Sequence, residues 1–246
     1  MSSNTFNKVR KVPEATLCKA AEDKEKLVRR IIGSVIYLAQ ISRYDILYSS
    51  NQPARATSNP SKAHMGAAKH LLRTLTGSID LNITYRKGGK KLTAFSDYCW
   101  GNSPDNGKST SSYVLMRNGP VSFKVGMQGL TDQSTMEAEL VAAALAMKEA
   151  VNCAGMMEEL GFEETFKCVP VHIDNTSALH VAGNKTYSSR AKHVVLKVFY
   201  VHEIIQEGKV SIHYIPTQFN IPDIGTKFLS KDRHRYLIGL INNFKT

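Results

Sequence analysis

The sequence predicts an α/β protein in which one mixed β-sheet carries helices on its faces. Three observations favour this class. Three strand-like segments come first after residue 91, a long Ala-rich helical stretch follows them, and strands then alternate with helices. A mostly helical segment is expected before the sheet, because residues 22–77 contain two amphipathic helical patterns.

The composition is that of a globular protein with room for one large domain or two small ones. The 246 residues are 42% hydrophobic and 22% charged. The four cysteines include no Cys-x-x-Cys pair, which suits a reducing compartment and argues against a disulfide framework or a zinc site. No apolar run reaches about 18 residues, and residues 1–17 lack an apolar signal core. We therefore expect no membrane partner and an intracellular location, cytoplasmic or nuclear.

The positive charge is concentrated in the first part of the chain. Residues 1–91 hold 17 Lys and Arg against 6 Asp and Glu, whereas residues 92–246 hold 15 of each kind. An asymmetry of this kind favours a polyanion partner, most simply nucleic acid, over a solvated basic surface with no partner.

Two helices are predicted before a boundary near residues 85–92, where glycines lie among basic residues. The first covers residues 22–42. Its predicted buried face consists of Leu27, Ile31, Val35 and Leu38. The second covers residues 58–77. Its basic outer side consists of Lys62, Lys69 and Arg73. That side could lie along a phosphate backbone or be the solvated face of an amphipathic helix.

The second part of the chain should read β-β-β-α-β-α-α-β-α. A strand at residues 91–97 precedes a hairpin at residues 111–126, which turns at Asn118-Gly119. The Ala-rich helix follows Ser134. The remaining elements are a buried strand at residues 169–174, helices at residues 175–183 and 188–208, a strand at residues 209–216 and a last helix from residue 220.

Three aspartates lie where these elements begin or end. Asp97 ends the first strand, Asp174 ends the fourth, and Asp223 lies in the first turn of the last helix. Singly, they could be a strand end, a helix cap and an acid favoured by the helix dipole. Together, they can face one crevice, where Mg²⁺ or Mn²⁺ would offset their repulsion. A pair of such ions is suited to in-line attack on a phosphodiester.

A fourth carboxylate comes from the start of the Ala-rich helix. Glu137 and Glu139 flank its apolar stripe on opposite sides, so the helical phase does not choose between them. Ser134 followed by Glu137 matches a capping box, which assigns Glu137 to the helix start. Glu139 is therefore the preferred metal ligand, and the alternative is that both are surface acids.

From about residue 27 to residue 230, the chain resembles the C-terminal part of copia-type LTR-retrotransposon Pol polyproteins. Matching stretches include FSDYCW, STMEAEL, IDNTSALHVA and PDIGTKFL, in the family's order. The resemblance implies a reverse-transcriptase connection segment at residues 1–91, a ribonuclease H-like domain at residues 92–230 and a C-terminal tail or helix at residues 231–246. In that family, the ribonuclease H domain cuts the RNA strand of RNA–DNA hybrids.

The resemblance also implies a site and its partners. The catalytic, metal-binding set would be Asp97, Glu139, Asp174 and Asp223, with two Mg²⁺ or Mn²⁺ ions. Expected partners are an RNA–DNA hybrid and the polymerase domain of a reverse transcriptase. The polymerase's own Tyr-x-Asp-Asp motif is absent from the sequence, so we expect no polymerisation by this chain.

The sequence departs from the family pattern in three places. SDYCW replaces the usual Ser-Asp-Ala-Asp-Trp, so an acid near Asp97 is lost. STSSY replaces Ser-Thr-Ser-Gly-Tyr, which puts Ser112 at the glycine. Gly225 and Phe228 stand where leucine and proline are common. None of these touches the four acids, but we expect a looser crevice.

Other side chains are candidates for nucleic-acid contact. They are the basic and ring side chains Lys62, Lys69, Arg73, Lys108, Arg190, Lys192 and His193. His193 matches a family motif, and either substrate binding or a bond to a helix neighbour would explain it, so it stays outside the catalytic set. For Trp100, core packing is expected rather than base stacking.

Two other functions stay open beside an endoribonuclease. A transposase or integrase would share the sheet and its metal chemistry, although the sequence shows no zinc-type His/Cys module for joining DNA. A non-catalytic relic of the same element could instead bind nucleic acid or serve as a co-opted interaction partner.

Overall fold

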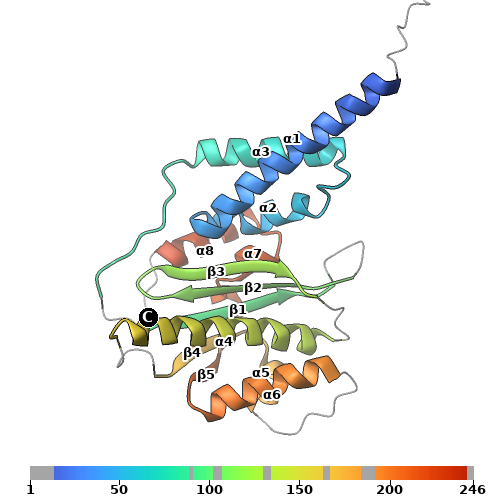
Figure 1. Cartoon of the computed structure of the whole chain (residues 1–246). Helices are drawn as coiled ribbons and strands as arrows, with labels where there is room; N and C mark the ends of the chain where they lie inside the picture. Colours follow the sequence, from blue (N-terminus) through green and yellow to red (C-terminus); the bar gives the residue numbers. More distant parts are fainter. Residues whose placement is uncertain are drawn as a thin grey trace, which may run out of the picture.

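In the computed structural model of the chain, the described residues are 14–88, 91–101, 107–129, 134–162, 167–183 and 192–242, without the side chains of residues 14–22 and 192–195. They form a five-stranded mixed sheet with helices on both faces and a helical segment before it (Figure 1). The predicted fold class is therefore confirmed.

The strand order of the sheet is β3-β2-β1-β4-β5. The strands are β1 (Thr93–Cys99), β2 (Thr110–Met116), β3 (Pro120–Met127), β4 (Val169–Ile173) and β5 (Val210–Tyr214). β1, β2 and β3 pair antiparallel, whereas β4 is parallel to both β1 and β5. The sheet therefore contains the five strands that the sequence predicts.

The β2–β3 hairpin turns where the sequence predicts. Asn118 has a φ of 59° and Gly119 a φ of 152°, values that suit a tight turn built from Asn and Gly. A Cβ at residue 119 would lie 2.8 Å from the carbonyl oxygen of Thr84, so this glycine also lets the preceding linker pass close to the turn. The backbone N–H of Arg86 donates to the carbonyl oxygen of Asn118 at 3.0 Å, which joins the linker to the sheet.

One face of the sheet is covered by α4 (Thr135–Glu159), α5 (Thr176–Gly183) and α6 (Lys192–Gln206). Their buried side chains form one hydrophobic cluster with Leu92, Ala94 and other residues on that face. By length and composition α4 could cross a membrane, but half of its most apolar stretch is buried inside the molecule. Because α4 packs across β1 and β2, it has the character of a core helix.

The opposite face carries helices from both ends of the chain (Figure 1). They are α1 (Glu14–Ile41), η1 (Tyr44–Ile46), α2 (Leu47–Ala54), α3 (Lys62–Gly77), α7 (Asp223–Thr226) and α8 (Lys231–Asn242). The short helix η3 (Thr217–Phe219) comes between β5 and α7 in the chain. A second hydrophobic cluster joins side chains of α1 to Phe95 of β1, Val114 of β2 and Leu237 of α8. Residues 231–242 are helical, as one of the two predicted alternatives for the C-terminal segment has it. The domain boundary predicted at residue 91 stays a prediction, and the second hydrophobic cluster contains residues from both sides of it.

The predicted buried face of the first helix is wrong by about one residue in phase. The buried stripe of α1 consists of Val28, Ile32, Val35 and Ala39. Leu27 and Leu38 are 46% and 41% exposed. The helix carries apolar residues on two adjacent stripes, and periodicity alone cannot tell which stripe meets the core. In α3, the basic residues are exposed as predicted, while Ala68 and Leu71 face inward.

Candidate active site

The parallel pairing of β1 and β4 places two predicted acids at the same end of the sheet. Ala94 of β1 is in register with Val171 of β4, so Asp97 and Asp174 each lie three residues further along the chain. Adjacent parallel strands end at the same edge, which is where a ligand crevice forms in such sheets. Asp97 is buried within β1, and Asp174 follows β4 directly.

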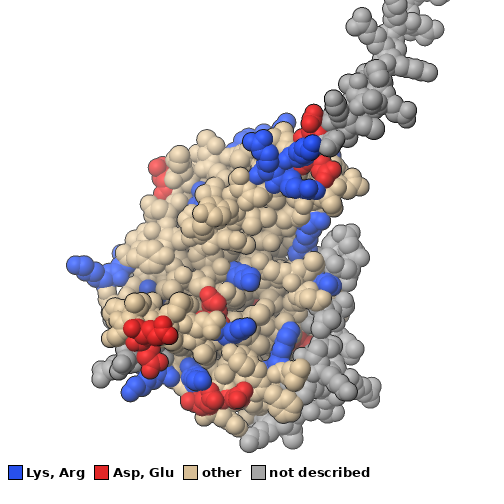
Figure 2. All heavy atoms as spheres, in the orientation of Figure 1, with Lys and Arg blue, Asp and Glu red and all other residues tan. Residues whose placement is uncertain are grey.

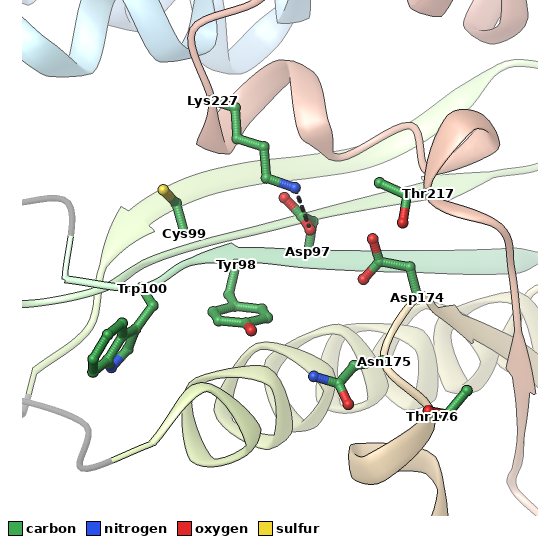
Figure 3. A pocket seen from close by; sticks show the side chains of 9 residues that line it. All are labelled: Asp97, Tyr98, Cys99, Trp100, Asp174, Asn175, Thr176, Thr217 and Lys227. Carbon is green, nitrogen blue, oxygen red and sulfur yellow. Dashed lines mark hydrogen bonds and ion pairs between the residues drawn. The ribbon is translucent and has the colours of Figure 1, made fainter.

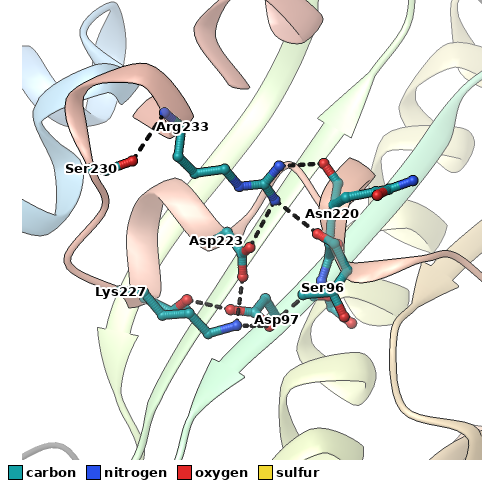
Figure 4. Close-up of polar contacts among 10 residues, drawn as sticks. Ser96, Asp97, Asn220, Asp223, Lys227, Ser230 and Arg233 are labelled. Carbon is teal, nitrogen blue, oxygen red and sulfur yellow. Dashed lines mark hydrogen bonds and ion pairs between the residues drawn. The ribbon is translucent and has the colours of Figure 1, made fainter. Parts of the chain in front are cut away.

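Asp223 reaches this edge from α7, which packs against β1 and β2. Its carboxylate is buried and accepts two charged donors: Lys227 Nζ lies 2.5 Å from Oδ1, and Arg233 Nη2 lies 3.1 Å from Oδ2 (Figure 4). Lys227 is four residues beyond Asp223, and Arg233 comes from α8. Both cations therefore hold Asp223 in place.

The Asp97 carboxylate accepts hydrogen bonds from residues just before and after Asp223 in the chain (Figure 4). Lys227 Nζ lies 3.3 Å from its Oδ1, and the Thr226 hydroxyl donates to its Oδ2. Asn220 Nδ2 lies 3.5 Å from Oδ1 and donates at 3.1 Å to the carbonyl oxygen of Ser96. Lys227 thus bridges the Asp97 and Asp223 carboxylates.

Glu139 is the fourth predicted acid, and its surroundings differ from those of the aspartates. It lies in the first turns of α4, is fully buried, and neither carboxylate oxygen has a hydrogen-bond partner among the described residues. Burial and the nearby Asp97 and Asp174 raise the pKa of Glu139 well above its ordinary value. A buried, unpartnered carboxyl group of this kind is costly to ionise unless a cation is supplied.

Glu137, two residues earlier, stands at the helix start as predicted. Its backbone N–H donates to the Ser134 hydroxyl at 3.2 Å, which is one half of the predicted capping box. The second half, a hydrogen bond from the backbone N–H of Ser134 to the Glu137 carboxylate, stays a prediction. Glu137 is half-buried, whereas Glu139 is fully buried, so the two acids occupy different environments.

A pocket of about 500 Å³ opens beside these acids (Figure 3). Its wall consists of Asp97, Tyr98, Cys99, Trp100, Asp174, Asn175, Thr176, Thr217 and Lys227. Trp100 is 53% exposed in this wall, so the expectation that it packs in the core is wrong. It follows the last residue of β1, where the chain leaves the sheet.

The charges of the cluster perturb one another. Burial raises the pKa of Asp97 to about 7, and the neighbouring Asp223 and Asp174 add to this rise, while Lys227 and the Thr226 hydroxyl partly offset it. Burial alone would lower the pKa of Lys227, but the carboxylates of Asp97 and Asp223 outweigh it, and the pKa is raised. The four acids therefore belong to one electrostatic unit with Lys227 inside it.

The donor set suits a hard divalent cation, although the side chains are not poised around one. No three Asp, Glu, His or Cys side chains among the described residues lie in an arrangement that could hold a metal ion as it stands. All candidate donors are carboxylate oxygens, which Mg²⁺ and Mn²⁺ prefer. The two orphaned oxygens of Glu139 fit such an ion, whereas the ammonium group of Lys227 already neutralises part of the Asp97–Asp223 side.

Four contributors to the site were missed by reasoning from the sequence: Asn220, Thr226, Lys227 and Arg233. The spacing of Asp223 and Lys227, four residues apart in a helical turn, is a signal that could have found the lysine. Arg233 reaches the site from the next helix, and only the packing of α8 reveals it.

The departure at Gly225 does not loosen the crevice. A Cβ at this residue would overlap the side chains of Val125 and Ser112, so only glycine lets α7 lie this close to β2 and β3. Ser112, which stands at another departure from the family pattern, is level with Asp97 in the β1–β2 register. The two departures therefore contact each other beneath the site.

The candidate nucleic-acid contacts come from three parts of the chain: α3, the segment before β2 and the chain around the start of α6. Lys62, Lys69 and Arg73 are exposed on α3, and Figure 2 shows Lys and Arg gathered over the upper helices and scattered singly elsewhere on this face. Lys108 Nζ donates to the carbonyl oxygen of Gly129 at 2.7 Å. Arg190 lies outside the described residues, as do the side chains of Lys192 and His193.

Comparison with known proteins gives relatives of one kind, although no family model matches the chain. The Pol polyprotein from transposon RE2 of Arabidopsis thaliana is 30% identical over 205 residues, which are 82% of this chain and 14% of the relative. That from transposon TNT 1-94 of Nicotiana tabacum is 27% identical over 86% of this chain and 16% of its own length. The Ty1-NL2 Gag-Pol polyprotein of Saccharomyces cerevisiae is 25% identical over 84% of this chain and 12% of its own length.

Solved structures with some likeness carry ribonuclease H names. RNase H1 from Halobacterium salinarum has a TM-score of 0.39 at 16% identity, covering 54% of this chain and 91% of its own. LC11-RNase H1, solved in complex with an RNA/DNA hybrid, has a TM-score of 0.38 at 12% identity, covering 53% of this chain and 88% of its own.

The chain spans only 12–16% of the length of these curated relatives. The resemblance predicted from the sequence is nevertheless confirmed: over more than four fifths of its length, this chain is similar to one segment of the retrovirus-related Pol polyproteins of transposons.

Proposed function

We propose that this chain is a metal-dependent endoribonuclease of the ribonuclease H type, which cleaves the RNA strand of an RNA–DNA hybrid. One observation carries the proposal. Four carboxylates from separate elements converge beside one pocket, and the innermost of them, Glu139, is buried without a partner. Similarity to a segment of transposon Pol polyproteins supports the same activity.

The chemistry of the cluster explains why a cation is required. Burial raises the pKa values of Asp97 and Glu139, and repulsion from the neighbouring carboxylates raises them further. Two bound Mg²⁺ or Mn²⁺ ions would activate a water molecule and stabilise the leaving oxygen of the phosphodiester. The residues that would hold them are Asp97, Glu139, Asp174 and Asp223.

The other side chains position these acids and receive the substrate. Arg233 and Lys227 fix Asp223 by ion pairs, and Thr226 orients Asp97. The pocket presents the exposed ring of Trp100 opposite the polar side chain of Thr217 (Figure 3). An aromatic face beside polar groups suits a nucleotide, whose base stacks and whose backbone accepts hydrogen bonds.

The proposal also covers how the hybrid duplex is bound, which protein is the partner and where in the cell the chain acts. The exposed basic side of α3 would contact phosphates of the hybrid outside the pocket. Because the matched relatives are Pol polyproteins several times longer than this chain, the polymerase domain of a reverse transcriptase is the proposed protein partner. The proposed location is intracellular, cytoplasmic or nuclear.

One observation favours a second candidate, a non-catalytic nucleic-acid-binding relic. All four carboxylate oxygens of Asp97 and Asp223 already accept hydrogen bonds or ion pairs from this chain's own donors. A site saturated by internal donors would bind nucleic acid without cutting it. Cleavage decides between the two candidates.

The test is a cleavage assay on an RNA–DNA hybrid of defined sequence, with duplex DNA and single-stranded RNA beside it. The wild-type chain should cut only the RNA strand of the hybrid, only when Mg²⁺ or Mn²⁺ is present. Glu139→Gln should abolish cutting, because it removes a charge from the cluster. Glu137→Gln is the matched control two residues away and should keep most of the activity.

Stability measurements separate loss of chemistry from loss of fold. Metal-free thermal melts of Glu139→Gln should match or exceed the wild-type melt, since a buried, unpartnered carboxyl group that is costly to ionise is replaced by a neutral amide. Glu137→Ala should lower stability by about 0.5–2 kcal/mol if the glutamate completes the cap. Hybrid cleavage that survives in Glu139→Gln, or hybrid binding without any cleavage by the wild type, would overturn the proposal.

A further inference from the structure

We propose that Lys227 is an internal cation of the carboxylate cluster. The free protein then takes up one divalent ion beside Glu139 and Asp174, and it admits a second ion only when the ammonium group of Lys227 moves away. This inference rests on the proposed function, because it concerns how the same cluster binds its metal ions.

The first step is the position of the ammonium group. Lys227 Nζ lies 2.5 Å from Asp223 Oδ1 and 3.3 Å from Asp97 Oδ1 (Figure 4). A divalent ion shared by these two carboxylates would need the same two oxygens. The lysine and such an ion therefore compete for one place.

The second step is an asymmetry between the two sides of the cluster. On the Asp97–Asp223 side, Thr226 and Arg233 engage the two carboxylate oxygens that Lys227 does not. On the other side, both oxygens of Glu139 are buried without any hydrogen-bond partner among the described residues. Glu139 is electrostatically coupled to Asp97 and Asp174, so a cation there would be attracted by three carboxylates.

The third step is the charge balance. Once metal binding has displaced any protons held by Asp97 and Glu139, the four carboxylates carry four negative charges, and Lys227 and Arg233 return two positive charges to them. One divalent ion neutralises the remainder. A second divalent ion would leave an excess of positive charge in a largely buried cluster, until the lysine leaves or a negatively charged phosphate arrives.

The fourth step is the freedom of the lysine to leave. Its side chain is 36% exposed and lines the pocket, whereas the Arg233 side chain is 23% exposed and also donates to backbone carbonyl oxygens of Thr217 and Gln218. Lys227 can therefore swing into the pocket without disturbing the packing of α7. A substrate phosphate in that pocket would accept the ammonium group.

The experiment is a Mn²⁺ titration of the full chain without nucleic acid, read by electron paramagnetic resonance and by calorimetry. The wild-type protein should bind one ion tightly. Lys227→Met should bind a second ion, or bind Mn²⁺ at least about tenfold more tightly, because a competing positive charge is gone. Lys231→Met, which removes an exposed lysine four residues away, is the matched control and should behave as the wild type.

A second measurement keeps the inference testable if Lys227→Met fails to fold without metal. In the wild-type chain carrying isotope-labelled lysine, the ammonium resonance of Lys227 should hold steady through the first equivalent of Mg²⁺ and shift only at the much higher Mg²⁺ concentrations at which a second, weakly bound ion enters. Two tightly bound ions in the wild type, or equal Mn²⁺ binding by Lys227→Met and Lys231→Met, would overturn the inference. A wild-type chain that binds metal as expected but leaves hybrids intact would instead overturn the proposed function.

Discussion

At the scale of single residues, the buried carboxyl of Asp97 links stability to pH. Its pKa in the folded protein is raised to about 7 by burial and by neighbouring acids, whereas an unfolded aspartate titrates near pH 4. Between these values only the unfolded state loses its proton, so unfolding becomes more favourable as pH rises. The raised pKa of Glu139 acts in the same direction.

We therefore predict that metal-free stability falls as pH rises from about 4 to about 7. Asp97→Asn should flatten this fall, because the amide does not titrate. Asp232→Asn, at an exposed acid in the first turn of α8, is the control and should leave the fall unchanged. Melting temperatures across this pH range in a metal chelator measure the effect, and equal slopes for the two variants would refute it.

The close approach of Ser112 and Gly225 links two of the departures from the family pattern. The Ser112 side chain fills the space into which a Cβ at residue 225 would project. The family usually has glycine at the position of Ser112 and leucine at the position of Gly225. In this chain the larger of the two residues is therefore at position 112 and the smaller at position 225. The side chain that fills this contact is thus supplied by Ser112 of β2, whereas in the usual pattern it would be supplied by α7.

The pair should show coupling in a double-mutant cycle. Gly225→Ala should destabilise the chain by about 1–3 kcal/mol, because its Cβ overlaps Ser112 and Val125. In a Ser112→Gly background the cost should be smaller, with a coupling of roughly 0.5–3 kcal/mol. Ser112→Ala keeps the Cβ at residue 112, so it should reduce the cost of Gly225→Ala less than Ser112→Gly does. Urea unfolding gives the energies, and strictly additive effects would contradict the contact.

The predictability of the site follows from where each residue lies in the chain. The positions of Asp97, Asp174 and Asp223 at the sheet edge were predictable because element ends are visible in the sequence. The different roles that the Ser134 N-cap predicts for Glu137 and Glu139 stay a prediction. Arg233 and Asn220 were not predictable, because their roles depend on how α8 and the segment before α7 pack on the sheet. The exposure of Trp100 likewise depends on what the fold leaves uncovered.

At the scale of elements, the sequence predicted turns and helix starts correctly, because these depend on a few neighbouring residues. The Asn-Gly turn located the hairpin, and the start of α4 followed from its N-cap. The buried face of α1 was mistaken because its two apolar stripes are equivalent until α2 and α3 are in place. The exposed basic side of α3, by contrast, was predictable, since lysine and arginine are rarely buried.

That basic side makes a prediction about hybrid binding. Neutralising its three residues should weaken affinity and lower the salt dependence, because each phosphate contact contributes about 0.9 to the slope of log affinity against log salt. The variant is Lys62→Gln, Lys69→Gln and Arg73→Gln combined. The control changes three exposed lysines elsewhere: Lys167, Lys209 and Lys231. Fluorescence anisotropy over a salt series measures the slopes, and similar slopes for the two triple variants would place the binding surface off α3.

At the scale of the whole molecule, the helical segment and the sheet are packed as one body. The second hydrophobic cluster contains residues of α1, the sheet and α8. Polar contacts support it: the ring of His234 lies 2.8 Å from the carbonyl oxygen of Asp45, and the Tyr44 hydroxyl lies 3.1 Å from Asn242 Oδ1. Deleting residues 1–91 would therefore uncover an apolar face of the sheet, and substitutions are the cleaner probe of this segment.

The last prediction is that α1 and the candidate site unfold together. Trp100 is the only tryptophan of the sequence and lines the pocket, so its fluorescence reports on the site. Ile32→Ala removes a fully buried side chain of α1 and should cost about 2–5 kcal/mol. If the two parts share one core, this loss should lower the urea midpoint of Trp100 fluorescence and of circular dichroism equally. Leu27→Ala, five residues earlier in the same helix at an exposed position, should barely move either midpoint. A Trp100 transition that ignores Ile32→Ala would show that the sheet folds independently of the helical segment.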